Sequence, residues 1–243
     1  MTDGEGRSAR DLVAGLGLRD ARGDGERPRV VAAMIATADG RAALQGRSVA
    51  LGHPADRALL RELRTGADAI LVGTPTLAAE RYANLLDADQ RAHRADAGLA
   101  EHPLVVTVSR ALALPLEVPL LHEPGRRILV FTESSAAAPE LGGELEVVRL
   151  APGTLTLTGV LEALGARGIR GVLCEGGPTL LRELVAQGGL DDVLLTVAPL
   201  LAAGDAPSIL EGEALPEPAR MSLREVHRAG DHVFLHYGLG AGR

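Results

Sequence analysis

The sequence predicts an α/β protein built on a mostly parallel sheet with helices on both faces. Short apolar segments alternate with segments of helical spacing over most of the chain, and this alternation is typical of parallel strands joined by crossover helices. Only Gly230 and Asp231 separate the last two apolar segments, which favours a C-terminal antiparallel hairpin. The chain has 243 residues and is 46% hydrophobic, enough for one generous core.

The N-terminal part divides into an arm and the start of the domain. Residues 1–28 lack sustained periodicity apart from a short amphipathic stretch, so we expect an arm at 1–28 and a single domain at 29–243. The domain opens with "VVAAMIATADG", a buried strand that runs into a polar turn at Asp39-Gly40. "HPADRALLRELRTGA" is a helix, because Pro54 suits its first turn and leucines recur on one face.

The remaining strands follow at regular intervals. They are expected at 67–73, 103–109, 126–132, 144–150, 171–175 and 191–199. After a loop at 202–218 that is rich in Pro, Gly and Glu, the closing hairpin occupies 221–230 and 231–238.

The connecting segments carry helix signals of different strength. Residues 74–86 form a loop or a helical turn. Thr158 can cap a helix at 159–168. Pro178 opens a further helix after the strand at 171–175.

Composition and charge exclude several classes of function. The net charge of -7 provides no basic field for nucleic acid or an anionic membrane surface. Aromatic residues make up only 2% of the chain, too few to stack bases. The first 29 residues contain neither a secretory signal nor a membrane span, so we expect a cytoplasmic protein.

Cysteine and histidine give no sign of a metal site. Cys174 has no partner for an internal disulfide, and its place in an apolar strand favours a small buried filler. His232 and His236 would share one face of a strand, but no third ligand lies near them in the sequence. We therefore expect no metal.

The junction "CEGGPTLL" could hold a phosphate. Two glycines between a strand and a helix leave the first amide groups of the helix free to approach an anion, which the helix dipole favours. The five residues of this possible pyrophosphate cradle are Gly176, Gly177, Pro178, Thr179 and Leu180. An ordinary tight turn explains the local sequence equally well. The chain has no Rossmann fingerprint in strand–helix context and no Walker pattern.

A set of motifs resembles one known family. "MIATADGRAAL", "ADAILVGTPT", "VTVSR" and "CEGGPTLLRELVAQGGLDDVLLTVAP" occur in the order and spacing of the pyrimidine reductases of riboflavin biosynthesis, which are dihydrofolate reductase-like. The resemblance covers most of residues 30–237. It implies a three-layer α/β/α fold with a mixed sheet, NADPH as the cofactor, a homodimer, and a Gly176-Gly177 peptide that is often cis.

The resemblance also implies cofactor contacts. Ala36 would end the first strand against the nicotinamide, and Thr76 would touch the cofactor after Gly73. Ser109 and Arg110 are placed like residues that hold the 2′-phosphate, where a guanidinium suits a dianion. In addition to the cradle residues, Glu80 would stand near the cofactor ribose and the substrate.

On the substrate side, the matching positions are Asp39, Ser48, Arg64 and Glu175. Each also has an ordinary structural interpretation: Asp39 as a turn former, Ser48 and Ser109 as loop hydroxyls. Arg64 could belong to a solvated stripe of arginines, and Glu80 could be an acid on a helix surface. For these two residues we favour the ordinary interpretation. Glu175 ends an apolar strand, so its carboxylate must be hydrogen-bonded or face a cleft.

Some positions depart from the family pattern. The lysine common in the first strand is Ala33, and the usual acid-acid-proline sequence is "AERY" here. Nothing resembles the zinc ligands of the deaminase domain that precedes the reductase in bifunctional members, so we expect the reductase half only. The departures fall on substrate contacts, not on the cofactor cradle.

The resemblance therefore implies NADPH-dependent reduction of 5-amino-6-(5-phosphoribosylamino)uracil to the ribitylamino product. Hydride would pass to the ribose C1′ of an opened, imine-like form, with Glu175 and Asp39 fixing the pyrimidine and the ribose hydroxyls. Two alternatives stay open: a dihydrofolate reductase-like enzyme acting on another pterin, folate or pyrimidine, and a catalytically silent NADPH-binding protein.

Overall fold

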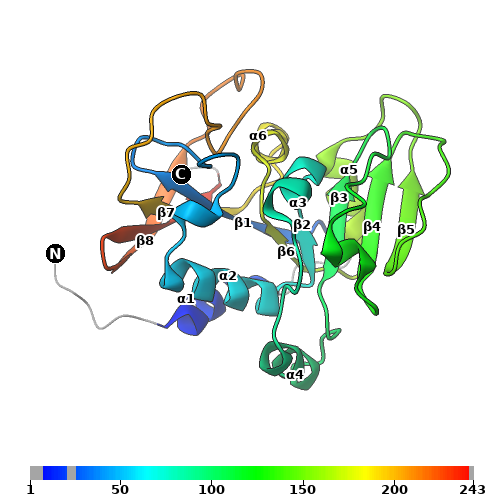
Figure 1. The fold of residues 1–243 in the computed structure, drawn as a ribbon, viewed down its shortest axis with the longest axis horizontal. Coiled ribbons are helices and arrows are strands. Elements are labelled where there is room, and N and C mark those ends of the chain that lie inside the picture. The colour runs from blue at the N-terminus through cyan, green and yellow to red at the C-terminus, as the bar shows by residue number, and fades with distance from the viewer. Residues whose placement is uncertain (1–7, 21–25, 241–243) are drawn as a thin grey trace.

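The computed structural model describes residues 8–20 and 26–240, which form one sheet with helices on both faces (Figure 1). Its strands are β1 (Arg29–Thr37), β2 (Ala69–Leu71), β3 (Leu104–Val108), β4 (Arg127–Thr132), β5 (Glu144–Arg149), β6 (Gly171–Cys174), β7 (Asp192–Ala198), β8 (Met221–Ala229) and β9 (His232–Leu239). Its α-helices are α1 (Ala9–Gly15), α2 (Pro54–Gly66), α3 (Thr74–Glu80), α4 (Ala88–Asp96), α5 (Leu157–Gly165) and α6 (Pro178–Ala186). Short 3-10 turns occupy Val49–Leu51 and Pro119–His122.

The sheet order is β5-β4-β3-β2-β6-β1-β7-β9-β8. All neighbours from β5 to β7 run parallel, and β9 pairs antiparallel with both β7 and β8. The predicted α/β fold, with a mostly parallel sheet and a C-terminal antiparallel hairpin, is confirmed.

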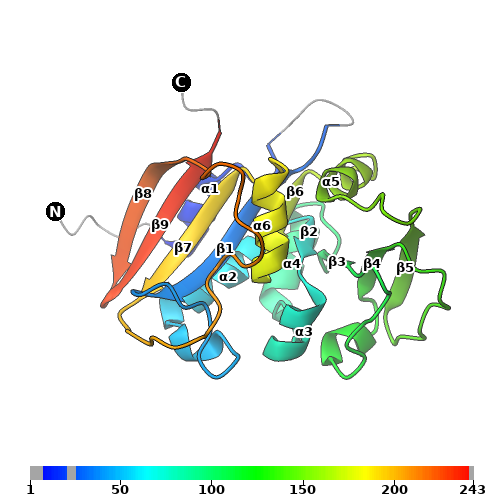
Figure 2. The same cartoon turned by 90° about the horizontal axis from the view of Figure 1, so that it is seen from above.

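Apolar side chains fill both sides of the sheet. Residues of β1 alternate: Val30 and Ala32 pack in the core beneath α5 and α6, and Val31 packs in the core beneath α1 and α2. Figure 2 shows α6 in front of the sheet and α1 and α2 behind it. This layering places the carboxyl ends of β1, β6 and β7 along one edge, where loops can form a binding cleft.

Helix α2 is fixed at both ends. The His53 ring accepts a hydrogen bond from the amide of Ala55 (3.1 Å), and Pro54 occupies the first turn as predicted. At the other end, the buried Arg94 guanidinium donates to the main-chain carbonyls of Arg64, Thr65 and Ala67. The helix is therefore a rigid support for the side chains that it presents to the cleft.

The described part of residues 1–28 packs against the domain. Ser8 caps α1, and Leu16 and Leu18 are buried in the core shared with α2. Arg19 pairs with Asp68 at 2.8 Å. Residues 1–7 and 21–25 of the predicted arm lie outside the described residues.

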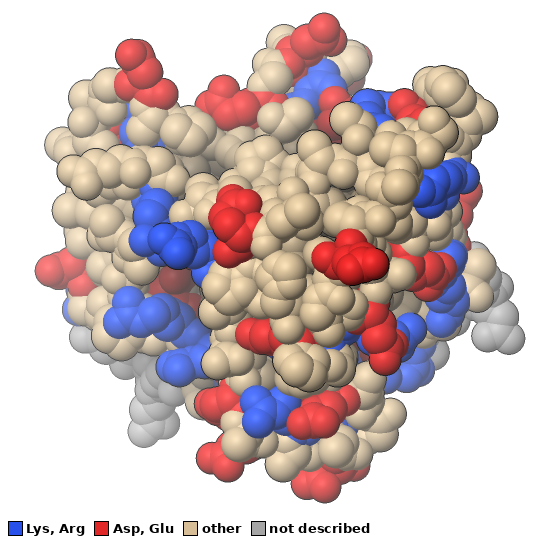
Figure 3. Space-filling model, turned by 45° about the vertical axis from the view of Figure 1, so that its right-hand side comes forward, with Lys and Arg blue, Asp and Glu red and all other residues tan. Residues whose placement is uncertain are grey.

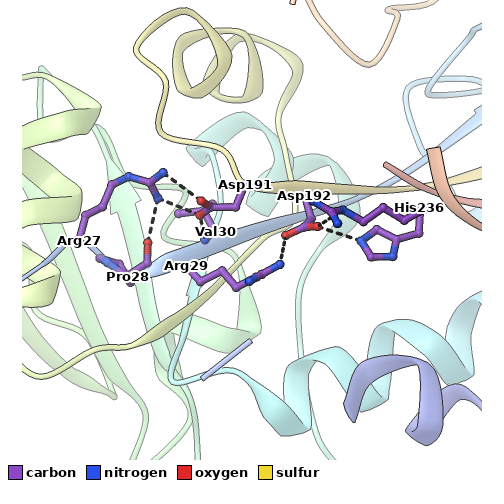
Figure 4. A network of polar contacts seen from close by, with 8 residues as sticks. Arg27, Pro28, Arg29, Val30, Asp191, Asp192 and His236 are labelled. Carbon is purple, nitrogen blue, oxygen red and sulfur yellow. Dashed lines mark hydrogen bonds and ion pairs between the residues drawn. The ribbon is translucent and has the colours of Figure 1, made fainter. Parts of the chain in front are cut away.

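Ion pairs join the amino ends of β1 and β7 (Figure 4). Arg27 donates to both carboxylate oxygens of Asp191. The fully buried Asp192 accepts from Arg29 (2.6 Å) and from His236 of β9 (2.9 Å). Burial would raise the pKa of Asp192, but the hydrogen bond from His236 and the charge of Arg29 lower it below its ordinary value. This network lies at the opposite edge of the sheet from the carboxyl ends of the strands, so it holds the scaffold together and not the cleft.

Two helices differ from the prediction. Helix α5 is capped by Thr156, not Thr158, because the Thr156 hydroxyl accepts a hydrogen bond from the amide of Gly159. The Gln187 side chain accepts from the amides of Leu157 and Thr158, which lie in the first turn. Helix α4 was not expected, because "ADQRAHRAD" has little apolar periodicity. A capping box between Asp87 and Gln90 starts this helix instead.

Candidate functional site

Two adjoining cavities open at the carboxyl ends of the strands. The first, of about 310 Å³, lies between β1, β7, α2 and α3, and the second, of about 390 Å³, lies between α3, the end of β3 and the start of α6. Their common wall is formed by Pro75, Thr76, Gly177 and Pro178. A ligand in one cavity can therefore meet a ligand in the other at the Gly176-Gly177 junction.

The Gly176-Gly177 peptide is cis, as the sequence analysis expected. Gly176 has a φ of +82°, a conformation that favours glycine. A Cβ on Gly177 would stand 2.8 Å from Thr76 Oγ1, and Gly73 donates to the carbonyl of Gly176 at 2.9 Å. The close approach of the loop after β2 thus explains why this junction carries no side chains.

Most of the expected cofactor residues surround the second cavity. Its lining includes Gly73, Thr76, Arg110, Gly177, Pro178, Thr179 and Leu180. The exposed Arg110 pairs with Glu133 at 2.9 Å, at the end of β4. Ser109 is buried, donates to the carbonyl of Ala113 and lies outside the cavity lining. Ala36 is also buried and outside both linings.

Glu175 is hydrogen-bonded on both carboxylate oxygens. Arg64 of α2 donates to Oε1 and Oε2, each at 2.7 Å, and the Tyr82 hydroxyl donates to Oε2 at 2.5 Å. The side chains of Arg64 and Glu175 are only 14% and 3% exposed. The expectation that Glu175 must be hydrogen-bonded is confirmed. The interpretation of Arg64 as a solvated surface arginine is wrong, because a buried carboxylate needs a charged partner.

The electrostatics of this group are strongly coupled. Burial alone would lower the pKa of Arg64, but the Glu175 carboxylate raises it well above its ordinary value. Burial, followed by the negative charge of Glu175, raises the pKa of Tyr82 far above 10.0. Arg64 therefore stays charged, and Tyr82 stays protonated as a donor to Glu175. Glu175 and Tyr82 both line the first cavity.

Glu80 and Ser48 meet at the rim of the first cavity. The amide of Ser48 donates to Glu80 Oε1 at 2.6 Å, and both residues contribute to the lining. Glu80 is partly exposed, so the interpretation as a helix-surface acid describes only part of its role. Its carboxylate ties the loop before α2 to the end of α3.

Asp39 lies apart from these residues. Its carboxylate accepts from the Thr37 hydroxyl at 2.5 Å and from the amides of Ala202 and Ala203 at 3.1 and 2.7 Å. These hydrogen bonds, the Thr37 bond first, lower the pKa of Asp39 to about 2. Asp39 is exposed and lies outside the lining of both cavities. Because it accepts from the amides of Ala202 and Ala203, it anchors the loop after β7.

Asp56 and Thr196 were missed by the sequence analysis. The Thr196 hydroxyl on β7 donates to Asp56 Oδ1 on α2 at 2.6 Å, and both side chains line the first cavity. Burial raises the pKa of Asp56 above 3.8, and the Thr196 bond opposes this. In the sequence, Asp56 looks like an ordinary acid in the first turn of a helix, where the helix dipole stabilises negative charge. The hydroxyl of Thr196 within an apolar strand was the signal available in the sequence.

Other classes of site find no support among the described residues. Within 8–20 and 26–240, no group of three or more His, Cys, Asp or Glu side chains could hold a metal ion. None of the described helices is long and apolar enough to span a membrane. Cys174 is buried, and burial raises the pKa of its thiol to about 12, as suits an inert filler. Figure 3 shows basic and acidic side chains interspersed over the face that it presents.

Comparison with known proteins gives consistent matches. The model of the RibD C-terminal domain matches residues 28–235. The 2,5-diamino-6-ribosylamino-4(3H)-pyrimidinone 5′-phosphate reductase of Methanothermobacter thermautotrophicus is 30% identical over 219 residues, which cover 87% of this chain and 98% of that protein. The riboflavin biosynthesis protein RibD of Mycobacterium tuberculosis is 32% identical over 184 residues, covering 75% of this chain and 45% of that longer protein.

Among solved structures, a pyrimidine reductase-like protein from Corynebacterium diphtheriae has the same fold. It superposes with a TM-score of 0.79 at 23% identity, and the alignment covers 97% of this chain and 100% of that chain.

Proposed function

This chain belongs to the RibD C-terminal domain family, and from that premise we propose that it reduces a ribosylamino-pyrimidine 5′-phosphate of riboflavin biosynthesis with NADPH. The first candidate substrate is 5-amino-6-(5-phosphoribosylamino)uracil. The observation that carries the proposal is the pair of cavities that share the wall at Thr76, Gly177 and Pro178. A reductase needs two ligands whose reacting atoms meet, and this wall is where they would meet.

The second cavity suits the dinucleotide. The start of α6 presents free amide groups beside side-chain-free Gly177, which fits a diphosphate. Arg110 offers a guanidinium to the 2′-phosphate that distinguishes NADPH, with Glu133 holding its position. When bound, NADPH supplies the hydride that reduces C1′ of the opened ribosylamino group.

The first cavity suits a ligand rich in hydrogen-bond donors. Its lining contains the carboxylates of Asp56, Glu80 and Glu175 and no basic side chain. Amino groups, ring N–H groups and ribose hydroxyls are donors that such acceptors would bind. The 5′-phosphate would have to project from the cavity, past Arg47, whose guanidinium lies against the carbonyl of Glu80 at the rim.

Glu175 would orient the substrate and not transfer a proton. Three of the lone-pair positions on its carboxylate are taken by Arg64 and Tyr82, which leaves one for a substrate hydroxyl. The contribution proposed for Asp39 is indirect, since it positions the loop after β7 that borders the cleft. Ala33, in place of the family's common lysine, gives the cavity an apolar wall there.

We also propose a homodimer. Met221, Leu223 and Val226 of the edge strand β8 are 47%, 55% and 49% exposed. A bulge between Leu223 and Glu225 shifts the register, so that Leu223 pairs with Tyr237 and Val226 with Leu235 on one face. Figure 2 shows no helix in front of β8 and β9. A second copy would cover this apolar face. A step that uses NADPH on a phosphorylated intermediate favours the cytoplasm.

The test is NADPH oxidation by the purified protein with each candidate substrate. We expect turnover with a ribosylamino-pyrimidine 5′-phosphate and none with dihydrofolate. Turnover of dihydrofolate alone would overturn the proposal, and tight NADPH binding without any oxidation would favour a silent cofactor-binding protein. The relative from M. thermautotrophicus takes its name from a 2,5-diamino-6-ribosylamino-4(3H)-pyrimidinone 5′-phosphate, and the match covers 98% of that protein. This 2-amino compound is therefore the second candidate substrate.

A further inference from the structure

The first cavity holds an acid, Asp56, whose particular partner on the substrate has not yet been identified. Asp56 and Thr196 line it from α2 and β7, and the other side chains that α2 and β7 contribute there are leucines, Leu59, Leu60, Leu63 and Leu194. Such a surface accepts a flat ring and offers it one polar contact. The contact is a carboxylate, which accepts hydrogen bonds and donates none.

The carboxylate of Asp56 is only partly satisfied. Thr196 donates to Oδ1, and no hydrogen bond from another described residue reaches Oδ2. Thr196 is itself buried, so the Oδ1 contact fixes the orientation of the carboxylate. Burial removes water from the Asp56 carboxylate and raises its pKa. A ligand that donates a hydrogen bond to Oδ2 would replace that water and so be stabilised there.

The distance between Asp56 and the Glu175 group matches one aminopyrimidine with its sugar attachment. Asp56 and Arg64 are eight residues apart on α2, about 12 Å along the axis. Glu175 follows β6 and Thr196 lies on β7, with β1 between them, a separation of about 10 Å across the sheet. A ring held at Asp56 would thus direct its ribosylamino substituent toward Glu175 and the wall shared with the second cavity.

We propose that Asp56, positioned by Thr196, binds the C2–N3 edge of the pyrimidine and makes the enzyme prefer a 2-amino substrate over its 2-oxo counterpart. This inference rests on the proposed function. A 2-amino-pyrimidin-4(3H)-one presents two parallel donors, N3–H and the amino group, which match the two oxygens of a carboxylate. A uracil presents N3–H beside the carbonyl oxygen at C2. That oxygen and a carboxylate oxygen of Asp56 would both be hydrogen-bond acceptors, so they would repel each other. The structure therefore favours the second of the two candidate substrates.

The test compares kcat/KM for the 2-amino and 2-oxo ribosylamino-pyrimidine 5′-phosphates. We expect the unmodified enzyme to prefer the 2-amino substrate at least about tenfold, because a site built for a donor rejects an analogue that lacks it. Asp56→Asn replaces one acceptor by a donor of the same shape, which matches the uracil edge, so the ratio should fall at least about tenfold. Glu62→Gln on the same helix, whose carboxylate lies outside the cavity lining, is the matched control and should leave the ratio unchanged.

Two results would overturn the inference. One is a ratio of the two kcat/KM values that Asp56→Asn leaves unchanged, and the other is a preference of the unmodified enzyme for the 2-oxo substrate. A second measurement separates it from the proposed function. Binding of the free bases, 2,5,6-triaminopyrimidin-4-one and 5,6-diaminouracil, by ligand-observed NMR requires no turnover. If neither phosphate is reduced, the proposed function fails, but a weaker preference for the 2-amino base in Asp56→Asn than in the unmodified protein would still support recognition by Asp56, and an unchanged preference would refute it.

Discussion

Replacing Arg64 by Met should destabilise the protein by far more than an ordinary helix substitution. Arg64 holds both oxygens of the Glu175 carboxylate at 2.7 Å, and Glu175 is only 3% exposed, so the variant leaves a charge buried without its counter-charge. Breaking a buried pair costs about 3–5 kcal/mol. Because the Tyr82 bond to Glu175 remains, we expect the lower end, about 3 kcal/mol.

Thermal unfolding followed by circular dichroism measures this loss. For a chain of this size, about 3 kcal/mol corresponds to a fall in Tm of about 6–12 °C. Arg61→Met is the matched control, since Arg61 is exposed on the same helix, and it should change the stability by less than about 0.5 kcal/mol. The double variant Arg64→Met/Glu175→Gln removes both charges and keeps an acceptor for Tyr82, so most of the loss should be recovered, with a coupling energy of about 2 kcal/mol.

Two results would refute this reasoning. One is an Arg64→Met protein that unfolds like Arg61→Met, which would mean that water reaches Glu175. The other is a double variant whose losses simply add. Glu175→Gln alone should also cut turnover far more than NADPH affinity, because Glu175 lines the cavity proposed for the substrate and its variant leaves the second cavity intact.

Three further predictions concern other parts of the molecule. Gly177→Val should abolish NADPH binding in a protein that still folds, since its Cβ would stand 2.8 Å from Thr76 Oγ1 and crowd the cradle; tight binding by isothermal calorimetry would contradict the cradle. The pKa of Asp39 falls from 3.8 to about 2 on folding, so its contribution to stability is complete above about pH 4 and is lost as the pH falls toward 2. Urea unfolding over that range should show a steeper loss in the unmodified protein than in Asp39→Asn, and parallel curves would exclude the Asp39 anchor. Leu223→Glu with Val226→Glu should convert a dimer to a monomer in analytical ultracentrifugation, whereas an unmodified protein that sediments as a monomer would rule out the proposed interface.

The fold was largely predictable because its signals are local. Apolar strands, Pro54 and Pro178 at helix starts, and the short turn at Gly230-Asp231 each specify their own segment. Helix α4 was missed because it depends on the capping box at Asp87 and on the buried Arg94, and neither produces an apolar stripe.

The candidate site was less predictable because its key contacts join distant segments. Arg64 and Glu175 are 111 residues apart, and Asp56 and Thr196 are 140 apart, so no spacing rule links them. Sequence spacing on α2 placed Arg64 in line with solvated arginines. Only the fold brings the carboxyl end of β6 against that helix and buries the pair.

The wall of Pro75, Thr76, Gly177 and Pro178 belongs to both cavities, so each bound molecule would form part of the other's surroundings. We therefore expect the two ligands to bind cooperatively. Thermodynamic reciprocity then fixes one relation: the factor by which the nucleotide tightens the pyrimidine must equal the factor by which the pyrimidine tightens the nucleotide.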